Sequence, residues 1–247
     1  MLAIIGGTGL TQLANLDVSR RQVVRTPYGE PSGPLTFGTL CGVPVIFLAR
    51  HGYGHTVPPH QVNYRANLWA LKEQGVGEIV SVASVGGIRA DLGTGKLVVP
   101  HQIIDYTWGR MSTFFENEAP VKHIDFTEPY AGSVRKKLLA AAKTCGEAAV
   151  DGAVYAATQG PRLESAAEID RFERDGADIV GMTGMPEAAL ARELELQYAA
   201  IAVVVNHAAG RADSAHGIEL GKIEEVLHEA MRRVRRIIET LVIQQAA

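Results

Sequence analysis

The stretch that decides the fold is LAIIGGTG, residues 2–9, in which an apolar run leads directly into a glycine-rich turn. Similar apolar runs recur along the chain, over residues 2–5, 45–49, 79–84, 102–105, 154–158, 178–181 and 199–205. Several runs are apolar throughout, as strands are when both faces of their sheet are covered. The pattern therefore predicts strands of a buried, largely parallel or mixed sheet.

Helical patterns lie between these runs. They are predicted near residues 63–74, 131–145, 164–175, 186–197 and 219–243. In the last one, apolar residues recur at spacings of three and four, with glutamates near its start and arginines nearer its end, which suits the helix dipole. The alternation predicts a three-layer α/β fold with a central mixed β-sheet flanked by helices. No linker, repeat or low-complexity stretch interrupts it, so we expect a single domain over residues 1–247.

Composition excludes several classes of protein. Of the 247 residues, 47% are hydrophobic and 21% are charged, which is ordinary for a globular domain and excludes a disordered chain. The chain has 24 basic and 27 acidic side chains, so it lacks the excess of positive charge that binding to long nucleic acids requires. No apolar run approaches the length of a membrane span, and the first residues lack a basic signal region. We therefore expect no membrane association and a cytoplasmic location.

Polar segments follow the first two strands named above, where ligands of α/β sheets gather. The glycines around Thr8 let the backbone approach an anion, and no Walker or dinucleotide fingerprint is present. Arg50 and His51 follow the next strand and can both donate to an oxyanion. His51 and His55 lie four residues apart, but the intervening and following glycines and prolines forbid a zinc-binding helix. These residues can therefore form an anion site, or else a plain strand turn and a loop histidine with a structural hydrogen bond. A metal site is not expected.

Later strand ends carry further candidates. Around Ala83 and Ser84, Val82 stands where a nucleophile elbow needs glycine, so this segment predicts a small-residue turn with Ser84 as a donor. Thr183 can reach an anion near a helix start, and Met182 offers an adaptable apolar surface. Asn206 ends an apolar strand, either as a turn former or as a ligand group. Arg162 can hold its turn as an ion-pair partner or contact a ligand.

Six segments in order carry a resemblance that covers almost the whole chain. They are residues 4–9 (IIGGTG), 26–29 (TPYG), 48–52 (LARHG), 62–67 (VNYRAN), 160–162 (GPR) and 182–187 (MTGMPE). Each segment is modest alone, but the ordered set resembles the methylthioadenosine phosphorylase branch of the purine nucleoside phosphorylase family. The resemblance implies a mixed-sheet α/β fold, a homotrimer or dimer of trimers, and no metal or organic cofactor.

The resemblance also implies residue roles. Phosphate would attack C1′ of a purine nucleoside, and phosphate and nucleoside would be the only partners. By family position the phosphate would be held by Thr8, Arg50, His51 and Thr183. Ala83 and Ser84 would line the phosphate–ribose region, and Met182 would lie against the ribose. Ala83 replaces a threonine of adenine-specific relatives, which leaves open whether Ser84 supplies the missing donor.

A second departure concerns the base. Adenine-specific relatives carry aspartates at the positions of Asn206 and Ala208, which flank His207 in the expected substrate-binding segment. An asparagine can accept from protonated N7 and donate to a 6-oxo group, whereas an adenine amino group would face its amide donor. Such mismatches discriminate strongly. Asn206 is therefore the expected catalytic group, and a 6-oxopurine the expected base.

The expected reaction is phosphorolysis of S-methyl-5′-thioinosine to hypoxanthine and 5-methylthioribose 1-phosphate, a purine salvage step. Residues expected to shape specificity are His123, Leu163, Glu164, Ile218 and Ile223, partly across a subunit interface. Phosphorolysis of methylthioadenosine, or of 6-oxopurine nucleosides generally, stays an alternative. So does a non-catalytic nucleoside-binding protein. The C5′ substituent and the choice between trimer and hexamer are left open.

Overall fold

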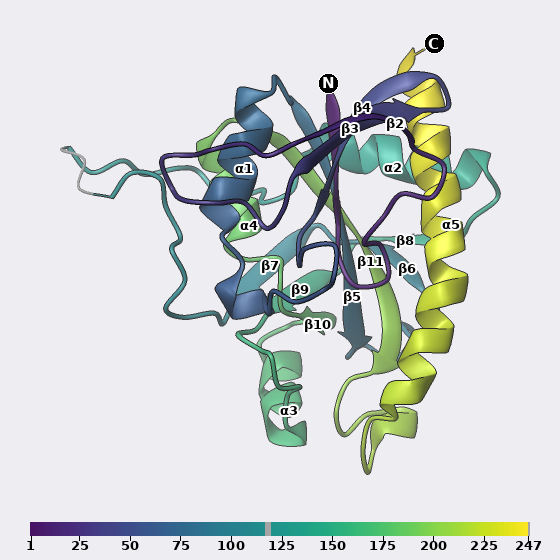
Figure 1. Cartoon of the computed structure of the whole chain (residues 1–247). Coiled ribbons are helices and arrows are strands. Elements are labelled where there is room, and N and C mark those ends of the chain that lie inside the picture. Colours follow the sequence, from purple (N-terminus) through teal and green to yellow (C-terminus); the bar gives the residue numbers. More distant parts are fainter. Residues whose placement is uncertain (117–119, 247) are drawn as a thin grey trace.

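A mixed sheet runs through the computed structural model, which describes residues 1–116 and 120–246 (Figure 1). Its strands are β1 (Leu2–Gly6), β2 (Asp17–Gln22), β3 (Leu35–Leu40), β4 (Val43–Ala49), β5 (Glu78–Gly87), β6 (Leu97–Val99), β7 (Gln102–Asp105), β8 (Ala149–Asp151), β9 (Val154–Ala157), β10 (Ile179–Gly181) and β11 (Gln197–His207). The order β2-β3-β4-β1-β5-β10-β9-β7 forms one path, and β11 pairs with β5 and β6, which in turn pairs with β8. Strand β5 is thus the point at which the sheet branches.

Helices cover both faces of the sheet. They are α1 (Tyr64–Glu73), α2 (Gly132–Thr144), α3 (Ala166–Arg174), α4 (Glu187–Glu193) and α5 (Leu220–Ala246), with short 3₁₀ turns at η1 (Pro59–Gln61) and η2 (Ala212–Ser214). Helices α1 and α4 lie on one side and α2 and α5 on the other, while α3 lies near β10 at one end (Figure 1). None of the helices in the described part of the chain is long and apolar enough to cross a membrane.

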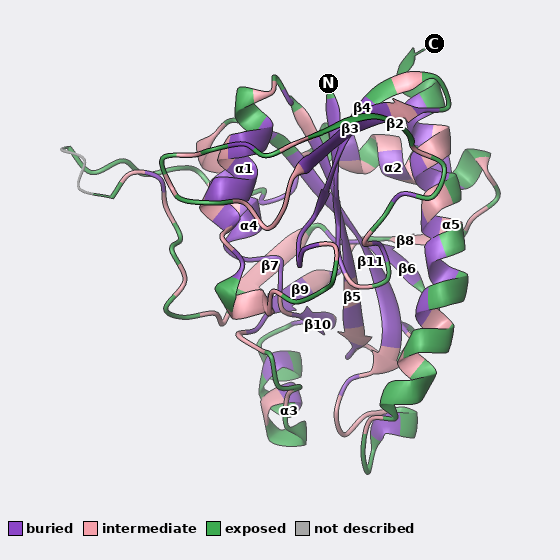
Figure 2. Ribbon diagram, viewed as in Figure 1, coloured by how far each residue is buried: buried purple, intermediate pink, exposed green. Residues whose placement is uncertain are grey.

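Two separate apolar clusters follow from the alternation of side chains along each strand. In β1, Ala3 and Ile5 face the cluster that contains α1 and α4, whereas Leu2 and Ile4 face the one that contains α2 and α5. The same division holds along β4, β5 and β11. Figure 2 shows the result: the central strands are buried over most of their length and α5 is buried along one side only.

The parallel pairing places the candidate functional segments together. Strands β4, β1, β5 and β11 are neighbours that run in the same direction, so their carboxyl ends meet at one edge of the sheet. Strand β10 runs antiparallel to the end of β5, with Val180 opposite Gly86, so the chain after Gly181 turns back along β5. The segments that follow β1, β4, β10 and β11 therefore converge, although they are far apart in the sequence.

The predicted fold class is confirmed, and all seven predicted strands and five predicted helices exist. Four strands were missed: β2, β3, β6 and β8. Strand β2 (DVSRRQ) is polar and exposed and carries no apolar alternation, while β6 and β8 have 3 residues each. The predicted helix at 186–197 is too long, because α4 ends at Glu193 and Glu195 turns the chain with a φ of 56° before β11 begins.

Candidate active site

A cavity of about 430 Å³ lies at the edge of the sheet where these segments converge. The four residues expected to hold phosphate, Thr8, Arg50, His51 and Thr183, line it together with Ser84, the candidate fifth donor. Other expected residues that line it are Ala83, Met182, Asn206, Ala208, Leu163, Glu164, Ile218 and Ile223. The structure therefore gathers side chains from seven separate stretches of the sequence around one space.

The floor of this cavity rests on a buried ion pair. The guanidinium of Arg50 donates to the carboxylate of Glu187 through Nε at 2.7 Å and Nη2 at 2.9 Å, and neither residue has any solvent exposure. Burial alone would lower the pKa of Arg50, but the adjacent Glu187 outweighs it and raises that pKa above its ordinary value. Arg50 therefore stays charged inside the protein.

Further hydrogen bonds engage other N–H groups of Arg50 and the carboxylate of Glu187. The hydroxyls of Ser81 and Tyr198 donate to Oε1 of Glu187 at 2.8 and 2.7 Å, and Ser81 in turn accepts from Nη2 of Arg50 at 2.6 Å. Nη1 of Arg50 donates to the Val82 carbonyl at 3.0 Å. A guanidinium has five N–H groups, and four are used here, so one Nη1–H is left on the side of Gly7 and the cavity.

His51 is held as a neutral ring. Its Nδ1 lies 2.8 Å from the Val57 carbonyl oxygen, which can only accept, so Nδ1 carries the proton. Burial, and then the charge of Arg50, lower the pKa of His51 to about 4. The unprotonated Nε2 can therefore accept a hydrogen bond from the P–O–H group of a hydrogen phosphate ion.

His55 packs beside His51, with ring centroids 4.7 Å apart, and also lines the cavity. Burial lowers its pKa. The two histidines alone do not make a metal site. Across residues 1–116 and 120–246, no group of three or more histidine, cysteine or acidic side chains is placed to hold a metal ion.

Asn206 reaches the cavity because strand β11 bulges just before it. Val204 pairs with Val85 and Asn206 with Gly86, so Val205 has no partner of its own. Bulges of this kind re-aim side chains next to active sites. The amide Nδ2 of Asn206 donates to the His207 carbonyl at 2.6 Å, which leaves one amide hydrogen and Oδ1 for a ligand.

Glu164 is the acidic side chain among the cavity-lining residues. The Thr158 hydroxyl donates to its Oε1 at 2.6 Å, and burial raises its pKa above the ordinary value. Oε2 is left to accept from a ligand. Glu164 directly precedes Ser165, which caps α3 in a reciprocal capping box with Glu168. A rigid helix start therefore holds this carboxyl group.

Two expected residues, His207 and His123, lie outside the cavity, and Arg162 takes the ion-pair role that was one of its two expected roles. His207 does not line the cavity, since its Nδ1 pairs with Oδ1 of Asp213 at 2.5 Å. His123 is exposed on the long segment between β7 and α2 and is also absent from the lining. Arg162 pairs with Glu168 at 2.7 Å, as an ion-pair partner rather than a cavity residue.

Sequence reasoning missed the residues that support the site. Glu187, Ser81 and Tyr198 were not singled out, although an arginine directly after a buried strand requires a buried carboxylate. Glu187 could have been suspected, because it is the acidic residue that follows Pro186 at a helix start. No pattern in the sequence would have found Tyr198, whose contact depends on the pairing of β11 with β5.

Known proteins share this chain's sequence and fold. Residues 1–243 match the phosphorylase superfamily. A probable S-methyl-5′-thioinosine phosphorylase from Pseudomonas syringae pv. tomato is 56% identical over 94% of each chain. A 6-oxopurine nucleoside phosphorylase from Pyrococcus furiosus is 46% identical over 85% of this chain and 80% of its own length. The structure of methylthioadenosine phosphorylase from Schistosoma mansoni in complex with adenine superposes with a TM-score of 0.94 at 32% identity, covering 99% of this chain and 91% of that one.

Removing the buried carboxylate should destabilise the protein strongly. In Glu187→Gln the charge of Arg50 stays buried without its partner, so the free energy of unfolding should fall by about 3–5 kcal/mol. Denaturant unfolding measures this. The control is Glu229→Gln, which removes the exposed partner of Arg232 and should cost less than about 1 kcal/mol. Equal, small losses in both variants would contradict the role of the pair.

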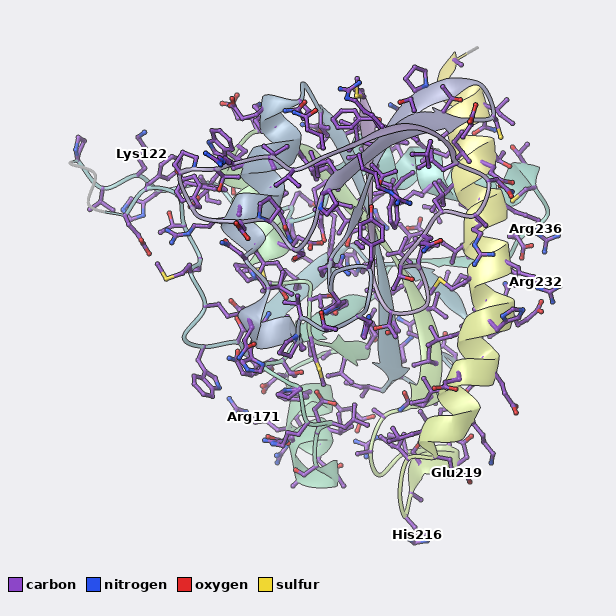
Figure 3. The ribbon with its side chains drawn as sticks, viewed as in Figure 1. Lys122, Arg171, His216, Glu219, Arg232 and Arg236 are labelled. Carbon is purple, nitrogen blue, oxygen red and sulfur yellow. The ribbon has the colours of Figure 1, made fainter. Side chains whose placement is uncertain are left out.

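The low pKa of His51 predicts a pH dependence of stability. The pKa of His51 is 6.5 in the unfolded chain and about 4 in the folded protein. Between these pH values the unfolded chain binds a proton at His51, and the folded protein does not. Stability should therefore fall as the pH drops through this window. In His51→Gln, unfolding free energies measured without phosphate should depend less on pH there. His216→Gln, at an exposed histidine (Figure 3), should keep the wild-type slope; the same slope in all three proteins would refute the assignment.

Proposed function

Because the chain belongs to the phosphorylase superfamily, we propose that it catalyses the phosphorolysis of S-methyl-5′-thioinosine. The products are hypoxanthine and 5-methylthioribose 1-phosphate, so the enzyme is a pentosyltransferase of purine salvage. One observation carries the proposal: a single cavity has anion-binding side chains on one side and the amide of Asn206 on another. The relatives named above support this choice of substrate, since the 56% identical protein carries that activity in its name.

The phosphate is the nucleophile. One Nη1–H of Arg50 and the hydroxyls of Thr8, Ser84 and Thr183 donate to its oxygens, and Nε2 of His51 accepts from its P–O–H group. An oxygen of the positioned anion forms a bond to C1′ as the bond from C1′ to N9 breaks, and the electron pair leaves with the purine. The sugar carries positive charge in the transition state, and the phosphate held beside it balances that charge.

The leaving purine gains negative charge, which a proton taken up at N7 from water neutralises. Oδ1 of Asn206 accepts from the protonated N7, and the amide hydrogen that is not bonded to His207 donates to O6. This interaction strengthens as the bond to the sugar breaks, so it contributes to catalysis as well as to binding. Ala208, buried against Gly86, offers no second polar group at this point.

Glu164 adds a second basis for choosing a 6-oxopurine. Hypoxanthine carries a hydrogen on N1 that a carboxylate can accept, whereas N1 of adenine has only a lone pair. Oε1 of Glu164 already accepts from Thr158, so Oε2 is the acceptor for N1–H. An adenine base would leave Glu164 facing a lone pair and Asn206 facing an amino group, which are mismatches that discriminate strongly.

The sugar end of the cavity is apolar. Met182 lies against the expected ribose position, and Ile218, just before α5, and Ile223, in its first turn, line the same cavity. Apolar side chains favour a methylthio group over a hydroxyl at C5′, because burying the hydroxyl without a partner costs free energy. Leu163 lines the cavity and is 40% exposed, so it lies at the mouth.

The proposal includes a homotrimer or a dimer of trimers. Between β7 and α2, residues 106–116 and 120–131 extend from the body of the molecule (Figure 1) and expose apolar side chains that a second copy can cover. These side chains are Trp108, Met111, Val121 and Ile124. His123 lies on this segment, so we propose that it acts at a neighbouring copy's cavity. We further propose that residues 1–247 act as one domain, in the cytoplasm and without a metal or organic cofactor.

A test of the reaction class is phosphate dependence. Hypoxanthine should be released from methylthioinosine only when phosphate is present, together with an equal amount of sugar 1-phosphate. Thr183→Val should raise the phosphate KM by at least about tenfold, the factor expected for losing a hydrogen bond to a charged group. Arg50→Ala is a poorer test, because it leaves Glu187 buried and unpaired.

The control for that variant is Thr240→Val, whose hydroxyl bonds its own helix far from the cavity. Hypoxanthine release without phosphate would indicate a hydrolase. Binding of nucleoside without any release would indicate a non-catalytic nucleoside-binding protein. Either outcome would overturn the proposed reaction.

A test of the base assignment is relative turnover. Methylthioinosine should be cleaved with a higher kcat/KM than methylthioadenosine, and Asn206→Ala should lower kcat/KM for methylthioinosine by at least about tenfold, equivalent to about 1.4 kcal/mol. Asn206→Asp combined with Ala208→Asp should shift the preference toward methylthioadenosine. If the unmodified enzyme prefers methylthioadenosine, the assignment of Asn206 and Glu164 is wrong. The kcat/KM values for inosine and guanosine, which carry a hydroxyl at C5′, measure the preference for the methylthio group.

A further inference from the structure

Arg110 lies outside the cavity lining, yet it bonds to two of the segments that form the cavity wall. Its Nη1 donates to the carbonyls of Met182 and Met185 at 2.8 and 2.5 Å. Its Nη2 donates to the carbonyls of Thr158 and Gln159 at 3.1 and 2.8 Å. Four carbonyl oxygens from two segments more than twenty residues apart in the sequence therefore converge on one guanidinium.

A third segment is tied to the same group. Nη1 of Arg110 also donates to the Tyr64 hydroxyl at 3.3 Å, and that hydroxyl donates to the Pro59 carbonyl at 2.9 Å. Pro59 lines the cavity on the stretch that follows Arg50 and His51. Nε of Arg110 donates to the side-chain oxygen of Gln159 at 3.2 Å, so every nitrogen of the guanidinium is engaged.

The three segments touch one another at Gly160, which has a φ of 61°. A Cβ placed on Gly160 would lie 2.4 Å from Sδ of Met182 and 3.0 Å from Cγ of Pro59. No space is therefore left between the segments. Their relative position depends on Arg110, because unpaired carbonyl oxygens that face one another repel and lose hydrogen bonds when buried.

We propose that Arg110 is a positioning residue that sets the distance between the two sides of the nucleoside site. One side is the turn that carries Glu164, which faces the base, and the other is the segment that carries Met182 and Thr183. The inference rests on the proposed phosphorolysis. A planar guanidinium matches several carbonyls at fixed angles, whereas the compact ammonium of a lysine cannot reach both segments at once.

This role predicts an unequal effect on the two substrates. The nucleoside spans both segments that Arg110 joins. Of the residues proposed to hold phosphate, only Thr183 lies on either segment, because Thr8, Arg50, His51 and Ser84 belong to the ends of β1, β4 and β5. Loss of Arg110 should therefore weaken nucleoside use much more than phosphate use, a split that a general loss of folding would not produce.

The test compares Arg110→Met, Arg110→Lys and Arg110→Ala with the unmodified enzyme, with rates normalised to folded protein. In each variant the nucleoside KM should rise by about tenfold or more, since small misplacements of a substrate lower rates by up to about a hundredfold. The phosphate KM should change by less than the nucleoside KM. Added guanidinium, far below a denaturing concentration, should restore part of the activity of Arg110→Ala only.

The matched control is Arg171→Met. Arg171 lies on the outer side of α3 (Figure 3), is largely exposed and pairs only with Asp175 at 3.7 Å among the ion pairs of the described residues. It should behave as the unmodified enzyme. Equal changes in both KM values, no change in either, or no rescue by guanidinium would overturn the positioning role. So would a chain that fails to fold even as Arg110→Lys, because Arg110 would then serve folding itself.

The inference can fail separately from the proposed function. If the unmodified enzyme shows no phosphate-dependent turnover, the proposed function fails, and hypoxanthine binding measured by calorimetry still tests Arg110. Binding weakened by about tenfold or more in Arg110→Met, with Arg171→Met unchanged, would support the positioning role. Equal binding in all three proteins would overturn it.

Discussion

The buried ion pair of Arg50 and Glu187 is the interaction on which the site depends. Two charges without solvent exposure are tolerated only because the carboxylate accepts four hydrogen bonds and the guanidinium donates four. The pair joins the end of β4 to the start of α4 across the face of β5. It therefore fixes the strand end that carries His51 and the helix start that follows Thr183.

In this arrangement the charge of Arg50 is balanced inside the protein, and mostly neutral groups face the cavity. Glu187 compensates most of the charge of Arg50, so the cavity receives one N–H and a set of neutral donors rather than a free cation. The neutral ring of His51 completes the set as an acceptor. Under the proposed function, such a site suits an anion that brings its own proton, as hydrogen phosphate does, because donors fixed by the fold lower the cost of binding charge.

Much of the fold and of the cavity could be predicted from the sequence, because apolar runs followed by glycine or polar residues mark strand ends directly. Thr8, Arg50, His51, Ser84, Thr183 and Asn206 were all predicted from strand ends, and all of them line the cavity. Supporting residues could not be found so easily. Arg110 contacts backbone carbonyls, which every residue has, and Tyr198 contacts Glu187 only because β11 pairs with β5. His207 was expected in the same segment because it is next to Asn206 in the chain, but its Nδ1 bonds Asp213 and it does not line the cavity.

The most direct measurement is a crystal structure of the protein with phosphate and hypoxanthine bound together. The account places phosphate against Thr8, Thr183 and Nε2 of His51, and places N7 and O6 of the base at the Asn206 amide with N1 at Glu164. An anion bound away from these residues, or a base turned with N1 away from Glu164 and O6 away from Asn206, would contradict the account.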